Sequence, residues 1–160
     1  MRSLRGMLLG AIILVLCQAG IGMATNLYVV VPTHHPGHHP ANYLSGSYDS
    51  VTWAIGHGTA VLAIHASLGL ALVIAVVGVG VHAFRARHLS ITVWTVIGGL
   101  LVIGAGFNGS SFLDFNDNAS SLIMALLAFG SIACYTVALF VLEGSPSSQS
   151  PSNRPEPQQG

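Results

Sequence analysis

Apolar residues gather into four long runs separated by short polar stretches. The runs cover residues 7–31, 51–84, 91–113 and 120–142. A helix needs about 20 apolar residues to cross a bilayer, and lipid leaves no partner for unpaired backbone groups, so each run is predicted to be a helix. The pattern predicts an all-α, four-helix transmembrane bundle with up-down topology. The second run is longer than one crossing needs, so it is expected to tilt or to project from the bilayer.

The arginines predict how this bundle is oriented. Arg2 and Arg5 precede the first run, Arg85 and Arg87 separate the second from the third, and the other two connections contain no Lys or Arg. Because basic residues collect on the cytoplasmic side, both termini are predicted to be cytoplasmic and residues 32–50 to lie outside the cell membrane.

The two ends of the chain have compositions of their own. "MRSLR" and the "GMA" before Thr25 also resemble a cleavable signal peptide, although the apolar sequence continues through "NLYVVV", which favours a retained helix. Residues 144–160 are rich in Ser, Pro and Gln, and we predict a disordered cytoplasmic tail there.

Composition narrows the classes of function. Only 6% of the residues are charged and 52% are hydrophobic, whereas soluble domains have about a quarter charged residues. The formal net charge is zero, which argues against nucleic-acid binding. No hydrolase, nucleotide-binding or metalloprotease motif is present, so the chain is expected to be non-enzymatic.

The first polar loop, "PTHHPGHHP", is dense in histidine. Imidazoles bind divalent or copper ions well, and a turn at Pro36-Gly37 would bring His35 and His38 together. The sequence therefore predicts a candidate metal site in this loop, and its candidate ligands are His34, His35, His38 and His39. Two alternatives remain: a pH response, since imidazoles titrate near pH 6.5, and a polar connector stiffened by prolines.

Polar residues inside the runs define two predicted depths, because polar groups in lipid usually face the bundle interior. The shallower layer lies about 8 Å below the outer interface and comprises Asn26, His57, Asn108 and either Ser121 or Met124. Asp114, near the end of the third run, is expected to be an exposed carboxylate or a partner of His57.

The deeper layer lies about 20 Å inward and comprises Cys17, Gln18, His65, Cys134 and Tyr135, beside Gly98 and Gly99. His65 is expected to bond to Gln18, to Tyr135 or to a backbone carbonyl, with haem ligation as the alternative. The two glycines either bring the third helix close or leave room for a flat ligand. Cys17, His65 and Cys134 are donor types that suit Cu(I) or Zn(II).

Two stretches carry a resemblance: "NLYVVVPTHHPGHHPANYLSGSYDSVTWAIGHGTAVLAIHASLGLAL" (residues 26–72) and "FNGSSFLDFNDNASSLIMALLAFGSIACYTVALF" (residues 107–140). They resemble small four-helix integral membrane proteins of actinobacterial type that have no assigned activity. That resemblance supplies no catalytic residues to transfer to this chain.

"HASLG" (residues 65–69) within a four-helix bundle is more loosely similar to membrane b-type cytochromes. That resemblance implies axial ligation of haem b, for which His57 and His65 are the candidate residues. Such cytochromes use two histidines from different helices, whereas the first, third and fourth runs contain none. A haem would then need Met23 or Met124, a five-coordinate iron, or a second subunit.

We therefore expect a non-enzymatic multi-pass membrane protein in contact with the lipid bilayer. The leading hypothesis for the function of the protein is haem or redox-accessory binding, and ion binding at the histidine loop is the alternative. A ligand-free scaffold, as a homodimer or within a membrane complex, is the third.

Overall fold

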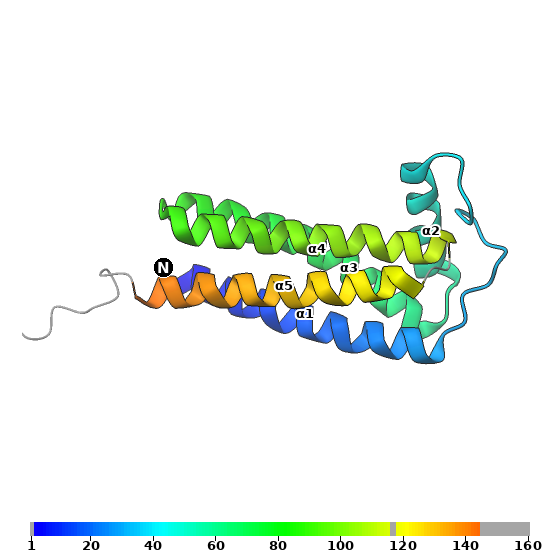
Figure 1. Ribbon diagram of the computed structural model, residues 1–160, viewed down its shortest axis with the longest axis horizontal. Coiled ribbons are helices and arrows are strands. Elements are labelled where there is room, and N and C mark those ends of the chain that lie inside the picture. The colour runs from blue at the N-terminus through cyan, green and yellow to red at the C-terminus, as the bar shows by residue number, and fades with distance from the viewer. Residues whose placement is uncertain (1, 116–117, 145–160) are drawn as a thin grey trace, which may run out of the picture.

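The computed structural model describes residues 2–115 and 118–144, and the regular secondary structure of this part of the chain is all helical. It contains five helices: α1 (Arg2–Tyr28), α2 (Tyr43–His57), α3 (Ala60–Arg85), α4 (Leu89–Phe115) and α5 (Asn118–Glu143). The four longer helices lie side by side in a bundle, and α2 stands across one end of it (Figure 1). The predicted all-α class is confirmed, while the predicted tail falls, except for Gly144, outside the described residues.

Four helices are long and apolar enough to cross a membrane: Ser3–Tyr28, Ala60–Arg85, Leu89–Phe115 and Ala119–Glu143. Each has 25 to 27 residues, and so a length of about 38–40 Å. Large apolar side chains such as Ile74, Leu100 and Leu122 are more than half exposed on their surface. Exposed apolar surface along four such helices is typical of a multi-pass membrane protein.

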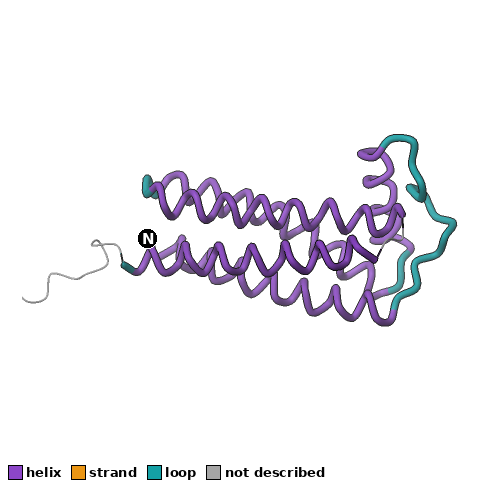
Figure 2. Tube along the Cα trace, in the orientation of Figure 1, coloured by secondary structure: helices purple, strands orange, loops and turns teal. Residues whose placement is uncertain are grey.

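The prediction of one long helix over residues 51–84 is wrong. The chain forms two helices there, α2 and α3, separated by Gly58 and Thr59 in extended conformations. The helix α2 also begins at Tyr43, inside the stretch predicted to be an irregular loop. Figure 2 shows this short helix at the end of the long loop. Gly58 closes α2 by donating its N–H to the carbonyl of Ala54, and a glycine followed by a β-branched residue is a weak continuation of a helix.

Each long helix contributes one apolar stripe to the main core. Leu4, Leu8, Ala11 and Val15 repeat at intervals of four and three residues along α1 and are all buried. That spacing puts side chains on one helix face. The same intervals recur on α3, and α4 and α5 complete the core; these members are Leu72, Val76, Val79, Ala83, Ile91, Val102, Tyr135, Ala138 and Leu142.

The two ends of the bundle differ in chemistry. At one, which we call the arginine end, Arg5 of α1 pairs with Glu143 of α5 at 3.0 Å, and α3 turns into α4. Both partners of this ion pair are more than half exposed, so it contributes at most about 1 kcal/mol. At the other, the histidine end, residues 29–57 lie against α3 and α4 (Figure 1).

Candidate functional site

The segment 29–57, which we call the histidine cap, consists of a loop and α2. Asn42 begins α2 by accepting hydrogen bonds from the N–H groups of Leu44 and Ser45, at 3.0 and 3.3 Å. The buried face of the helix is made of Gly46, Ser50 and Ala54, one every fourth residue. Small side chains on one face allow close backbone approach. The loop and α4 can therefore pack directly against α2.

A turn at Pro36 and Gly37 folds the loop back on itself. The N–H of His38 donates to the carbonyl of His35 at 3.2 Å, and Gly37 has φ +91°. Proline at the second position, glycine at the third and a positive φ there are the features of a type II turn. The predicted Pro-Gly turn is confirmed. His39 follows with a φ of +49°, which changes the direction of the chain again.

These two turns bring aromatic rings into a continuous row. Trp53 of α2 stacks on His35, with centroids 4.5 Å apart and planes inclined by 19°. The ring centroid of His38 lies 5.6 Å from that of His35 and 4.4 Å from that of His39, and both pairs meet edge to face. His39 in turn lies 5.5 Å from Phe115, at the end of α4. The row thus connects α2 to the bundle through three imidazole rings that contact one another in turn, those of His35, His38 and His39.

His35 has an acceptor at each ring nitrogen. Its Nδ1 lies 2.8 Å from the carbonyl oxygen of Pro36, and its Nε2 lies 3.2 Å from the carbonyl oxygen of Leu113 in α4. A carbonyl oxygen only accepts, and a neutral imidazole has only one N–H to donate. Only a doubly protonated ring can donate at both positions, and the ring lies over the face of Trp53, where a cation would have a favourable cation–π geometry.

Asp114 is the polar anchor of the cap. Its side chain is fully buried and accepts hydrogen bonds from Ser50 Oγ at 2.5 Å and Ser47 Oγ at 3.5 Å. Its backbone carbonyl accepts the N–H of His39 at 3.0 Å. The prediction of an exposed carboxylate is therefore wrong, because two serines of α2 shield it. The chain has no Lys or Arg between residues 5 and 85, so the charges near Asp114 come from imidazoles.

The charge state of His38 depends on this neighbourhood. Partial desolvation and then the nearby imidazoles of His39, His35 and His34 lower the pKa of His38, while Asp114 acts in the opposite direction. The neutral form of His38 is consequently favoured inside the row, and one of its ring nitrogens keeps an available lone pair at a lower pH than in a free imidazole.

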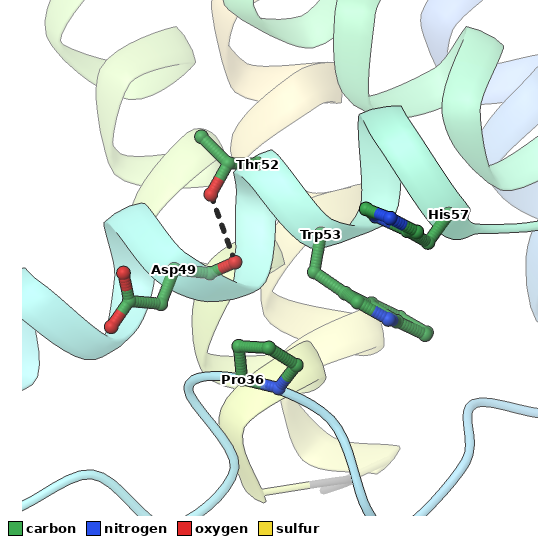
Figure 3. Close-up of a pocket in the computed structure, with 5 residues that line it drawn as sticks. All are labelled: Pro36, Asp49, Thr52, Trp53 and His57. Carbon is green, nitrogen blue, oxygen red and sulfur yellow. Dashed lines mark hydrogen bonds between the residues drawn. The ribbon is translucent and has the colours of Figure 1, made fainter.

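His57 lies far from its predicted position inside the bundle. It is the last residue of α2 and is exposed. It lines an open pocket of about 440 Å³ with Pro36, Asp49, Thr52 and Trp53. In Figure 3, His57 and Trp53 lie together on one side, while the carboxylate of Asp49 points away from them. The expected shallow layer is thus incomplete, because the break at Gly58 moves His57 out of the membrane-spanning helix.

The other members of the shallow layer form hydrogen bonds either between helices or within one helix. Ser121 donates to Asn26 Oδ1 at 3.1 Å, which joins α5 to α1. Asn108 donates to the carbonyl of Gly104 on its own helix. The pair Asn26 and Ser121 confirms that these two positions share a depth.

The deeper layer contains one confirmed contact, between α1 and α3. Gln18 Nε2 donates to the carbonyl of His65 at 3.0 Å and lies 3.4 Å from its Nε2. A Cβ on Gly22 would lie 2.8 Å from the His65 ring, so the ring packs tightly on α1. The expectation that His65 bonds to Gln18 is confirmed.

The two glycines of α4 accommodate a side chain of the protein itself. Tyr135 is fully buried, and a Cβ on Gly98 would lie 2.8 Å from its ring. Close approach of the helices is thus the correct alternative, and Tyr135 occupies the space considered for a flat ligand. Cys17 is exposed and Cys134 is buried, so the soft-metal set of Cys17, His65 and Cys134 does not assemble.

The predicted four-histidine metal site also does not assemble as a ligand set. Within residues 2–115 and 118–144, no three His, Cys, Asp or Glu side chains converge on one point. His34 bonds instead to Thr33 Oγ1 at 3.0 Å, and both nitrogens of His35 face carbonyl oxygens. The structure does bring His38 and His39 together.

Sequence reasoning missed the roles of Asp114, Ser47, Ser50 and Trp53. Two signals were present. An acidic residue in the last turn of an apolar helix opposes the helix dipole and needs compensating donors. Asparagine, here Asn42, is also a favoured N-cap residue. It predicts the start of a helix in which Ser47 and Ser50 lie on one face.

Comparison with known proteins gives no family assignment. No protein-family model matches the chain, and no curated protein or solved structure matches it significantly.

Proposed function

We propose that the four long helices cross the cell membrane in alternating directions, with both termini in the cytoplasm and the histidine cap outside. The arrangement of charge supports this. Arg5 and Arg85 belong to the end opposite the cap, and the cap itself contains no Lys or Arg. Basic residues are retained on the cytoplasmic side of membrane proteins.

We infer that the protein is a proton-responsive membrane protein, in which the histidine cap changes its docking on the bundle with external pH. The observation that carries this inference is the pair of carbonyl acceptors at His35, one of which belongs to α4. A proton on His35 adds a hydrogen bond and a charge over Trp53. Loss of that proton removes one bond and leaves a nitrogen lone pair facing a carbonyl oxygen.

His38 makes the docking of the cap depend on pH in a direction that can be stated. Because the pKa of His38 is lowered in the docked cap, its contribution to docking is complete above the ordinary imidazole range near pH 6.5. That contribution is lost as the pH falls through the lowered pKa. The cap is therefore expected to loosen from the bundle in acid.

Several other titratable groups surround this row. His34 and His39 belong to the same loop, Asp114 faces the cap from α4, and Asp49 and His57 line the neighbouring pocket. His34 and Asp49 are exposed, so solvent screens their charges more than the charge of the buried Asp114.

Trp53 fluorescence tests the proton response. In a Trp94→Phe background, Trp53 is the one remaining tryptophan, and its emission should fall as the stacked His35 becomes an imidazolium. His35→Gln should abolish this transition. His34→Gln, which removes an exposed imidazole from the same loop, should keep it. A titration that is identical in His35→Gln and in the parent would contradict the proposal.

A second candidate function is binding of a divalent or copper ion. The observation in its favour is the contact between His38 and His39, together with the lowered pKa of His38, which keeps it available as a neutral ligand. An exposed two-histidine site would bind weakly and compete with protons.

Zn²⁺ and Cu²⁺ titration calorimetry at neutral pH tests this candidate. Replacing His38 and His39 together with alanine should reduce binding to the detection limit, whereas the double replacement of His82 and His88, distant in sequence from the cap, should leave it unchanged. Equal binding by the two double variants would overturn it.

The haem hypothesis has less support, because it depends on His65. This residue packs against α1 and its Nε2 faces the Gln18 amide, and His57 lies at the exposed end of α2. A bis-histidine haem would need His65 of a second copy, in a homodimer or a membrane complex.

A further inference from the structure

The arginine end contains a second, smaller pocket that the proposed function does not use. Its volume is about 200 Å³, and it is lined by Ser3 and Leu4 from the first turn of α1 and by His82, Arg85 and Ala86 at the end of α3. The pocket therefore lies where two membrane-spanning helices end, next to the headgroup region of the leaflet that surrounds this end.

Arg85 gives the pocket an uncompensated positive charge. Its side chain is exposed and has no carboxylate within ion-pair distance among the residues that the structure describes. Glu143, at the same end of the bundle, pairs with Arg5. Arg87 follows Arg85 after one residue and adds a second guanidinium to the same turn. A guanidinium fork without a carboxylate partner matches the geometry of a phosphate group.

The other lining groups suit the same ligand. His82 donates its Nδ1 proton to the carbonyl of Gly78 at 3.2 Å, so its ring lines the pocket without being one of the donors to an anion. The Ser3 side chain supplies a hydroxyl, and the first N–H groups of a helix have no partner within it. The guanidinium, the hydroxyl and the helix N–H groups are donors of three kinds around one cavity, and none of the described residues that line it is acidic.

Apolar surface next to the pocket would accommodate acyl chains. Phe84 is 64% exposed and Leu89 is 78% exposed, and these residues lie immediately beside the Arg85–Arg87 turn. A free phosphate ion would gain nothing from that surface, whereas a phospholipid would use both the charge and the apolar flanks.

We propose that this pocket binds the phosphate headgroup of an anionic phospholipid, with Arg85 as its main contact. The bound lipid would fix α1 against α3 at the arginine end, where the pocket separates their termini.

Native mass spectrometry of the full chain in mild detergent tests the proposal, with phosphatidylglycerol and phosphatidylcholine as probes. Wild type should bind phosphatidylglycerol preferentially, and Arg85→Gln should weaken that binding by about fivefold, the effect of one basic residue near a charged headgroup. The matched control is Arg5→Gln, which removes the same charge from the same end but does not line the pocket. It should bind phosphatidylglycerol like wild type.

Three outcomes would overturn the proposal. Equal binding of the two lipids would exclude a headgroup site, and equal losses in Arg5→Gln and Arg85→Gln would show that the overall charge of this end is responsible. Complete displacement of phosphatidylglycerol by millimolar inorganic phosphate would assign the pocket to a free anion. Circular dichroism of both variants would confirm that either loss of binding occurs in a folded chain.

Discussion

Gly37→Ala is expected to detach the loop of the histidine cap from α2. Gly37 has φ +91°, a conformation that costs a residue with a Cβ about 1–3 kcal/mol. The added methyl group would also clash with Ser50 Oγ, and it would lie 2.5 Å from the carbonyl oxygen of Gly46. Both obstacles are parts of α2, so the loop has to move away. Together the two effects should cost about 3 kcal/mol or more.

Hydrogen exchange of the α2 amides measures this effect. A loss of about 3 kcal/mol in docking should accelerate their exchange by roughly 100-fold. Gly56→Ala is the matched control, because it makes the same chemical change within the cap at a position where a Cβ meets nothing within 4 Å. It should exchange as slowly as wild type, or more slowly, since alanine favours helix. Slow exchange in Gly37→Ala would show that the loop does not depend on this turn.

The membrane-spanning helices were predictable because lipid imposes a simple rule on them. Runs of apolar residues near 20 in length must be helices, and the predicted runs at residues 91–113 and 120–142 differ from α4 and α5 by about two residues at each end. The division between α2 and α3 was not predictable from hydrophobicity. Gly58 and Thr59 interrupt the helix without interrupting the apolar run.

The candidate site was predicted in part. The density of histidine identified the loop, and the Pro-Gly signal correctly predicted the turn that brings His35 toward His38. The roles of Trp53 and Asp114 depend on how α2 docks on α4, and that is a long-range contact. Sequence spacing along one element gives no information about such a contact, so a buried carboxylate was mistaken for an exposed one.

Asp114→Ala is expected to loosen the cap as strongly as the change at Gly37, and for an electrostatic reason. The substitution removes the 2.5 Å acceptor of the buried Ser50 hydroxyl, which keeps only a longer contact of 3.4 Å to the carbonyl of Pro36. It also removes the weaker bond to Ser47. Loss of a hydrogen bond to a charged group costs about 1.5–3 kcal/mol. Removing the negative charge from the C-terminal end of α4 also relieves an unfavourable interaction with the helix dipole, which stabilises the variant by at most about 1 kcal/mol. The net result should be a loss of about 2–3 kcal/mol, visible as faster exchange of the α2 amides.

Asp49→Ala is the control for this change, since it removes a carboxylate from the exposed face of α2 and should leave the exchange rates unaltered. Asp114→Asn separates the charge of the anchor from its shape: it can still accept from Ser50, but it no longer attracts a protonated imidazole in the row. The asparagine variant should therefore keep the cap docked near neutral pH and release it in acid at a higher pH than wild type, because Asp114 opposes the lowering of the His38 pKa. If Asp114→Asn released the cap at the same acidic pH as wild type, repulsion among the imidazoles alone would control the release.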